Sequence, residues 1–232
     1  MGEYSFHGYG GLLLQGAWLS LRLAIASGAY ALGLGLLLAI LKLRGAGIGA
    51  RLATGYTTVI RGVPDLLLML LIYFSAQQAL NSATEALGWR QIDIPAFAAA
   101  CFSIGGVLAA YFAETFRGAL LAVPYGQREA GLAIGLSRFQ VFRRIWFPQA
   151  MIHGIPALSN NIQVLIKATG IVSILGLNDI VNAAQQVGRA TNQPLLYLIF
   201  AGCVFLVMTG TSQLVLSALQ RSLDHGIRSS AT

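Results

Sequence analysis

Five stretches of this sequence contain no Asp, Glu, Lys or Arg, and each is long enough to cross a lipid bilayer as a helix. A helix rises about 1.5 Å per residue, so roughly 20 apolar residues span a hydrocarbon core of about 30 Å. The charge-free runs are Leu23–Leu41, Leu66–Thr84, Ile94–Ala113, Ile145–Ile166 and Ala190–Gln220. We therefore predict an all-α membrane protein with five transmembrane helices, at about 12–41, 63–82, 94–116, 154–176 and 194–219.

The composition supports lipid as the main solvent of this chain. Of its 232 residues, 56% are hydrophobic and only 10% are charged, whereas an ordinary soluble domain is about 25% charged. The apolar excess excludes a disordered chain. Eight acids, fifteen bases and three histidines supply too little polar surface for a soluble enzyme.

Lys and Arg are concentrated in alternate connections between the predicted spans. Eleven of the fifteen are Lys42, Arg44, Arg51 and Arg61 after the first span, Arg117, Arg128, Arg138, Arg143 and Arg144 after the third, and Arg221 and Arg228 after the fifth. Because basic connections stay in the cytoplasm, we expect the N-terminus outside the cell and the C-terminus inside. The net charge of +7 thus reflects topology, and no nucleic-acid partner is needed to explain it.

Motifs for catalysis and for metal binding are absent from the sequence. Neither lysine is followed by Ser or Thr, so the phosphate-binding pattern G-x-x-x-x-G-K-S/T cannot be formed. The three histidines have no acid or thiol at ligand spacing. We predict no catalytic residue, no metal site and no cofactor bound by this chain.

The connection 123–148 is the most patterned stretch outside the spans. Good helix formers occupy residues 127–134, Gly135 can adopt the left-handed conformation that ends a helix, and Ser137 with Gln140 matches a capping box. This pattern predicts a cytoplasmic helix-turn-helix. On one face its first helix carries small or apolar side chains, namely Ala130, Ala133 and Ile134.

The pattern alone leaves three interpretations of this loop open. It is consistent with an interfacial helix pair near lipid phosphates, with a DNA-binding helix-turn-helix in a membrane-anchored regulator, and with a protein-docking element. The DNA-binding interpretation is disfavoured, because predicted spans tether the loop closely on both sides.

The same stretch resembles the EAA loop, E-A-A-x3-G-x9-I-x-L-P, of the membrane subunits of bacterial ABC importers. The residues that match in order and spacing are Glu129, Ala130, Gly131, Gly135, Ile145 and Pro148. Gly131 replaces the second alanine and Phe147 replaces the leucine. Segments 56–68, 110–120 and 158–179 also resemble polar-amino-acid permeases, so the likeness covers nearly the whole chain.

This resemblance implies a type I ABC importer-like permease, with residues 1–232 as a single transmembrane permease domain. It implies that Glu129, Ala130, Gly131 and Gly135 couple the chain to an ATPase. The expected partners are membrane lipid, a second and related permease subunit, two cytoplasmic ATPase subunits that hold ATP-Mg, and a periplasmic binding protein. The expected location is a bacterial inner membrane.

The resemblance also implies a substrate class, namely basic amino acids such as histidine, arginine, lysine or ornithine. Two alternatives stay open in the transport class: an importer permease for another polar amino acid or an opine, and a self-sufficient channel or carrier. A self-sufficient carrier would normally contain inverted repeats, and none is evident in the sequence.

Polar side chains recur at helical spacing in the fourth predicted span. Pro156, Asn160, Gln163 and Lys167 fall on one stripe. A charge at the centre of a span costs about 2.5–3.5 kcal/mol on insertion scales, so such groups face protein or water. Asn160, Gln163 and Lys167 either border the translocation route or hydrogen-bond between helices, and Lys167 either pairs with Glu114 or reaches a membrane interface.

Glu114 and Asp65 are two further candidates for the route. Glu114 lies three residues before Arg117, which favours a local ion pair, and Asp65 follows Pro64, which favours a charge at a helix N-terminus. We keep both because a permease for cations favours acids along its route. The predicted outer segments, with Glu3, Glu85, Asp93 and Asp179 against Arg90 and Arg189, also favour a basic substrate.

Overall fold

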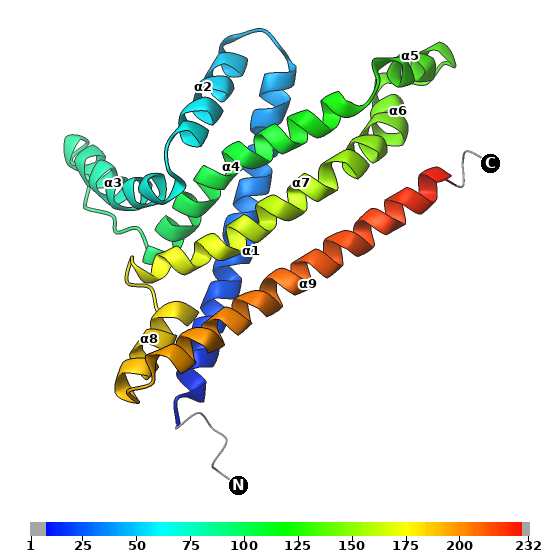
Figure 1. The fold of residues 1–232 in the computed structure, drawn as a ribbon. Helices are drawn as coiled ribbons and strands as arrows, with labels where there is room; N and C mark the ends of the chain where they lie inside the picture. The colour runs from blue at the N-terminus through cyan, green and yellow to red at the C-terminus, as the bar shows by residue number, and fades with distance from the viewer. Residues whose placement is uncertain (1–7, 229–232) are drawn as a thin grey trace.

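The computed structural model describes the backbone of residues 8–228 and the side chains of residues 8–223. Glu3 and the side chain of Arg228, both used in the charge arguments above, lie outside the described residues. The described residues form helices without any β-strand (Figure 1). The α-helices are α1 (Gly10–Leu43), α2 (Ile48–Gly62), α3 (Asp65–Ala86), α4 (Ala96–Ala122), α5 (Tyr125–Ala133), α6 (Arg138–Val141), α7 (Phe147–Ala168), α8 (Ile180–Ala190) and α9 (Pro194–Arg228).

Four helices of the described residues are long and apolar enough to cross a membrane: α1, α3, α4 and the Pro194–Leu223 part of α9. They lie along the first, second, third and fifth predicted spans. α7 lies along the fourth predicted span. It does not belong to the four long apolar helices, because its polar side chains lower its mean hydropathy. The fold is therefore the expected all-helical membrane type, and the membrane position of α7 stays a prediction.

The predicted bounds of the fourth span, 154–176, are wrong as helix bounds. α7 begins at Phe147 and ends at Ala168, and a 3₁₀ turn, Thr169–Ser173, follows it. The residues before Pro148 are also helical, since α6 and a π-helical turn, Phe142–Trp146, lead directly into α7. The helix therefore begins before this proline.

The sequence analysis does not predict α2 and α8. α2 contains Arg51 and Arg61, and these charges interrupt the apolar runs on which the span search depends. α8 begins at a side-chain cap, since Asp179 Oδ1 accepts a hydrogen bond of 3.0 Å from the Asn182 backbone N–H. Each is amphipathic and covers the bundle near one end.

α4 is the central helix of the bundle. It packs along α1 on one side and along α7 on the other, while α9 packs on α7 and α8. Fully buried alanines, among them Ala31 on α1 and Ala110 on α4, let the backbones approach closely. The most apolar stretch of α4 is 67% buried, against 11% in α3 and 11% in α9, so the last two helices present mostly uncovered faces.

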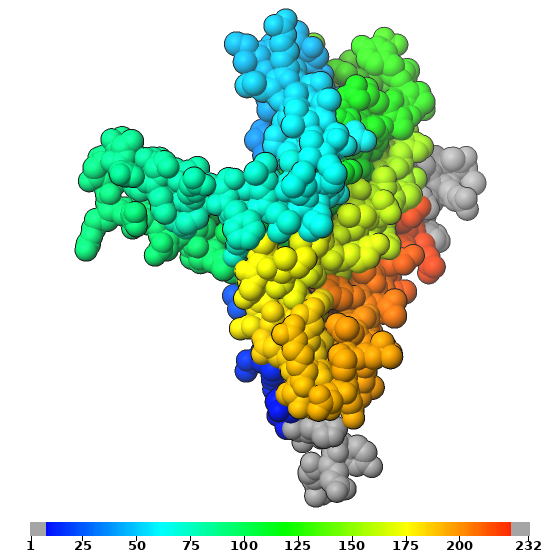
Figure 2. Space-filling view, turned by 60° about the vertical axis from the view of Figure 1, so that its left-hand side comes forward, coloured from blue at the N-terminus to red at the C-terminus, as the bar shows by residue number. Residues whose placement is uncertain are grey.

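The two ends of the bundle differ in what they carry (Figure 1). The α1–α2 connection, α5 and the C-terminal part of α9 lie toward the upper end, while α8 and the start of α1 lie toward the lower end. We call the end that carries α5 the loop end. Figure 2 shows that the second half of α3 and the segment after it project sideways from the body.

Candidate functional site

Residues 123–148 form the helix-turn-helix that the sequence predicts. α5 ends at Ala133, and Gly135 turns the chain with a φ of +86°. Both hydrogen bonds of the capping box are present: Ser137 N–H donates to Gln140 Oε1 at 2.8 Å, and Gln140 N–H donates to Ser137 Oγ at 3.3 Å. Local signals therefore suffice to specify this element.

The second helix of the loop is continuous with the bundle. α6 continues through a π-helical turn, Phe142–Trp146, directly into α7. Trp146 Nε1 donates a hydrogen bond of 2.9 Å to the Leu120 carbonyl near the end of α4, and the Arg128 guanidinium of α5 stacks 5.2 Å above the Trp146 ring. We call residues 125–146 the coupling element; it is tied to α4 and α7 together.

Gly131, which departs from the alanine of the resembled motif, lies where α5 meets the π-helical turn. It is the one buried residue of α5. A Cβ at this position would lie 2.7 Å from Ile145 Cδ1 and 3.0 Å from Val141 Cγ2. The glycine therefore permits this close packing, whereas the Cβ of an alanine would require Ile145 or Val141 to move.

The opposite side of α5 is open to solvent or to a partner. Glu129 and Ala130 are exposed, and so is Ile134 with 76% of its surface accessible. Among the described residues, Glu129 has no ion-pair partner. An uncommitted acid beside small apolar side chains suits docking to another protein.

Glu114 and Asp65 lie in one polar cluster where α1, α2, α3 and α4 meet. The Glu114 carboxylate pairs with Lys42 of α1, and Lys42 Nζ also donates a hydrogen bond of 2.7 Å to Thr57 Oγ1. Tyr111 Oη donates to Asp65 Oδ1 at 2.7 Å. The acid cluster, as we call it, comprises Lys42, Thr57, Arg61, Asp65, Tyr111 and Glu114.

The sequence suggests two ion pairs for Glu114, one with Lys167 and one with Arg117, and the structure contains only the second. Lys167 does not pair with Glu114, because Lys42 occupies that carboxylate. Arg117 lies within reach of Glu114, but at 3.8 Å and with 41% of its side chain exposed. It is therefore the weaker partner. Asp65 occupies the first turn of α3 as expected for a helix N-terminal charge.

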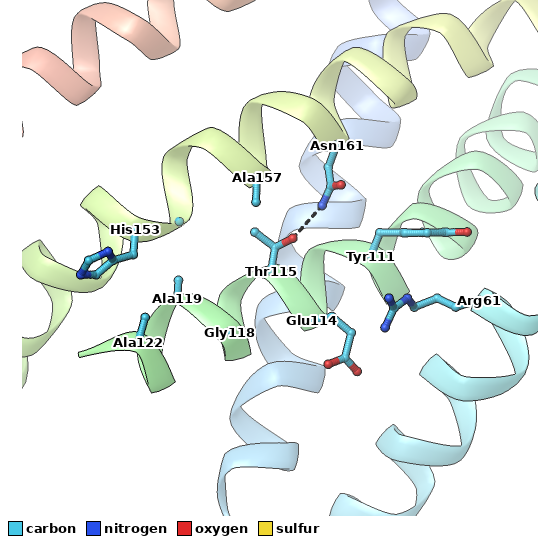
Figure 3. Close-up of a pocket in the computed structure, with 11 residues that line it drawn as sticks. Arg61, Tyr111, Glu114, Thr115, Gly118, Ala119, Ala122, His153, Ala157 and Asn161 are labelled. Atoms are coloured by element: carbon cyan, nitrogen blue, oxygen red, sulfur yellow. Dashed lines mark hydrogen bonds between the residues drawn. The ribbon is translucent and has the colours of Figure 1, made fainter. Parts of the chain in front are cut away.

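A cavity of about 380 Å³ opens between α4 and α7 next to the acid cluster. Its lining, drawn in Figure 3, includes Glu114 and Thr115 of α4, Arg61 of α2, and His153 and Asn161 of α7. Asn161 Nδ2 donates a hydrogen bond of 2.9 Å to Thr115 Oγ1. The Arg61 guanidinium at this cavity offers a partner for a carboxylate.

Asn160 and Gln163 lie on another side of α7 and do not reach this cavity. They line a separate groove of about 300 Å³ between α7 and α9. The polar residues of this amide groove are Ser159, Asn160, Gln163, Gln213, Ser217 and Gln220. Lys167 is exposed and lines none of these spaces.

The structure thus divides the five tentative route residues into three groups. Asp65 and Glu114 share the acid cluster, Asn160 and Gln163 share the amide groove, and Lys167 stands apart. Sequence reasoning missed Arg61 and Tyr111, although each lies within four residues of a chosen acid. It also missed Asn161, which is buried beside the cavity and differs by one position from the predicted stripe.

Asp179 does not supply an open acidic charge, contrary to the count of outer acids above. It is fully buried and caps α8, and its Oδ2 atom has no hydrogen-bond partner. Burial raises the pKa of this carboxyl. Among the described residues, no group of three His, Cys, Asp or Glu side chains is placed to hold a metal ion.

Comparison with known sequences finds relatives along nearly the whole chain. The family described as "binding-protein-dependent transport system inner membrane component" matches residues 31–229. The histidine/lysine/arginine/ornithine transport system permease protein HisQ of Escherichia coli (strain K12) is 47% identical over 96% of this chain and 97% of its own length. The octopine transport system permease protein OccQ of Rhizobium meliloti is 34% identical over 87% of this chain and 86% of its own.

Comparison with solved structures finds the same architecture. One chain in a crystal structure described as an amino acid ABC transporter with histidines superposes with a TM-score of 0.76. It is 29% identical in sequence, and the match covers 96% of this chain and 99% of that one.

Proposed function

This chain belongs to the family of binding-protein-dependent transport system inner membrane components and is a non-catalytic permease subunit of an amino acid ABC importer; on that premise we propose that its cargo is a basic amino acid. The observation that carries the substrate class is the 47% identity, over 96% of the chain, with a permease named for histidine, lysine, arginine and ornithine.

The proposed complex contains two permease half-units, two cytoplasmic ATPase subunits that bind ATP-Mg, and a periplasmic binding protein, in a bacterial inner membrane. The chain enters this complex as one transmembrane domain of residues 1–232, with α7 as the fourth of five spans, the N-terminus outside the cell and the C-terminus inside. Five spans are few to enclose a gated route alone, which supports pairing with a second permease.

The proposed coupling site is the exposed side of α5. Glu129 and Ala130 would contact the ATPase, while Gly131 holds α5 against the π-helical turn and Gly135 sets the angle to α6. Because Trp146 and Arg128 tie the coupling element to α4 and α7, a displacement of α5 is passed to both helices. The cavity beside Glu114 lies between these two helices, so their movement would change its access.

The proposed route passes the cavity between α4 and α7, beside Asp65 and Glu114 of the acid cluster. Asn160 and Gln163 face α9 on another side of α7 and would border the route only where two permease subunits meet. Lys167 lines none of the spaces described above and is left out of the route. Arg61 lines the cavity and is well placed to meet a substrate carboxylate.

Reconstitution tests this function directly. The purified permease pair, its ATPase and candidate binding proteins would be placed in vesicles, and ATP-dependent uptake of labelled arginine, histidine, lysine and glutamine would be measured. We expect uptake of one or more of the basic amino acids to exceed that of glutamine at least tenfold, and Glu129→Lys to abolish uptake while the permease still assembles. Uptake of glutamine alone would refute the substrate class, and uptake without the ATPase would support a self-sufficient carrier.

A further inference from the structure

The amide groove is a polar and accessible surface between α7 and α9. Four amide side chains line it, Asn160 and Gln163 from α7 and Gln213 and Gln220 from α9. Among the described residues, none of the four has a side-chain hydrogen bond. All four are exposed or half-buried in the isolated chain.

The groove lies at the level of the spans. α7 packs along α4 and α9, and both of those helices are long and apolar enough to cross a membrane. Two residues beyond Gln163, Leu165 of α7 lines an apolar groove together with Gly28, in the middle of α1. Two residues beyond Gln213, Val215 lines an apolar groove of about 510 Å³ formed with α1. The α7–α9 pair therefore has an apolar side and an amide side at similar depth.

Lipid chains suit the apolar side but not the amide side. A primary amide moved into hydrocarbon without hydrogen bonds costs several kcal/mol, about 4–8 on a water-to-cyclohexane scale, so polar groups at this depth face protein or water. The low burial of α9, 11% over its most apolar stretch, leaves room for another helix to pack there. The cytoplasmic ATPase and the periplasmic binding protein are soluble and would meet the chain at its two ends.

We propose that the amide groove is the surface through which this chain contacts the second permease subunit within the membrane. Every amide both donates and accepts hydrogen bonds, so this surface is self-complementary and suits a two-fold contact with the equivalent surface of a copy or a related chain. Interhelical amide hydrogen bonds of this kind strengthen association in membranes. The proposal rests on the proposed function, because it presumes two permease half-units, and it is compatible with a route between them.

Site-specific photo-crosslinking in the assembled complex tests this surface. A benzoylphenylalanine side chain would be introduced at Gln213 or Gln220, with Val215 as the matched control on the same helix. After irradiation in native membranes, mass spectrometry would identify the linked molecule. We expect Gln213 and Gln220 to yield adducts that join two permease chains, and Val215 to yield lipid adducts or adducts within its own chain, with at least tenfold fewer links between two chains.

Other adducts would overturn the proposal. Lipid as the main product at Gln213 would mean that the amide side faces the bilayer, and ATPase or binding-protein peptides would mean that the groove lies outside the membrane. A second measurement uses Asn160→Leu combined with Gln213→Leu, which should lower the amount of co-purified second permease several-fold, whereas Val215→Leu should not. Uptake by the unmodified complex is measured in parallel, so normal uptake without permease adducts refutes this surface alone, and permease adducts without basic amino acid uptake refute the substrate class alone.

Discussion

At the scale of single residues, the pairing of Lys42 with Glu114 joins α1 to α4 through two charged side chains. Their side chains are 9% and 24% exposed, and Lys42 is also hydrogen-bonded to Thr57. A charge in such a place is stable only while its partner is present, because desolvation opposes the unpaired ion. The pair thereby fixes the loop end of α1 against α2 and α4.

Lys42→Met is therefore expected to destabilise the protein by leaving the Glu114 carboxylate without its partner. We expect the free energy of unfolding to fall by about 1–3 kcal/mol, below the 3–5 kcal/mol typical of a fully buried pair, since Glu114 keeps some contact with solvent. For a chain of this size each kcal/mol corresponds to about 2–4 °C in Tm, which thermal unfolding in detergent would measure. Lys42→Met combined with Glu114→Met should recover part of the loss, while Arg117→Met should change the Tm little. A full-size effect of Arg117→Met would contradict the assignment of Lys42 as the main partner.

Asp179 gives a pH-dependent prediction. Its pKa is raised in the folded state by burial, so the unfolded chain releases this proton at lower pH than the folded chain does. Between the two pKa values the folded state binds more protons, and stability falls as the pH rises. Asp179→Asn keeps an oxygen that can cap α8 and removes the buried charge, so its Tm should exceed that of the parent by a margin that grows with pH over the range above the ordinary pKa of an aspartate. Thermal unfolding across that range measures the margin, and Glu85→Gln, at an exposed acid, is the control. A margin that stays constant with pH would show that Asp179 does not titrate as described.

At the scale of the elements, the coupling element and α7 show what a sequence can and cannot specify. The turn at Gly135 and the cap of Ser137 with Gln140 depend on residues within a few positions of each other, so local patterns predict them. The continuity of α6 with α7 depends on the packing of Trp146 against Leu120 and Arg128. Those contacts bring together residues up to 26 positions apart, and no periodicity reports them.

Trp146→Phe is expected to weaken the transmission of movement while leaving the docking surface of α5 intact. It removes the hydrogen bond to the Leu120 carbonyl and reduces the stacking of Arg128, a loss of about 1–2 kcal/mol from these two contacts together. In reconstituted vesicles we expect the amount of bound ATPase to stay unchanged and uptake per ATP hydrolysed to fall several-fold.

Phe139→Leu is the matched control, because Phe139 is exposed on α6 and makes no described contact with α4. Loss of ATPase binding in Trp146→Phe would instead indicate that the tryptophan maintains the shape of α5 itself. Unchanged uptake per ATP would show that the hydrogen bond to α4 carries none of the movement.

At the scale of the whole molecule, the main lesson concerns polar residues in apolar helices. The sequence analysis places Asn160, Gln163 and Lys167 on one stripe and joins them with Glu114 and Asp65 as a single route. A helical stripe covers a wide arc, however, and the neighbours of α7 divide it: α4 covers the side of Asn161, while α9 adjoins the side of Asn160. Which helices flank a given helix is a long-range property, and it decides the surroundings of each polar side chain.

The sidedness of the bundle is the last expectation to test, because the arrangement of the helices is independent of which end faces the cytoplasm. The basic connections after the first and third spans lie at the loop end (Figure 1), and an ATPase could contact α5 only if that end is cytoplasmic.

Single cysteines would replace exposed Ser137, in the loop, and exposed Arg90, between α3 and α4, with Cys101→Ala and Cys203→Ser in the background. A membrane-impermeant maleimide applied to spheroplasts should label the Arg90→Cys protein at least tenfold faster than the Ser137→Cys protein, and permeabilisation should make the two rates similar. The reverse preference would place α5 outside the cell, where no ATPase could reach it, and would refute the coupling role of Glu129 together with the topology.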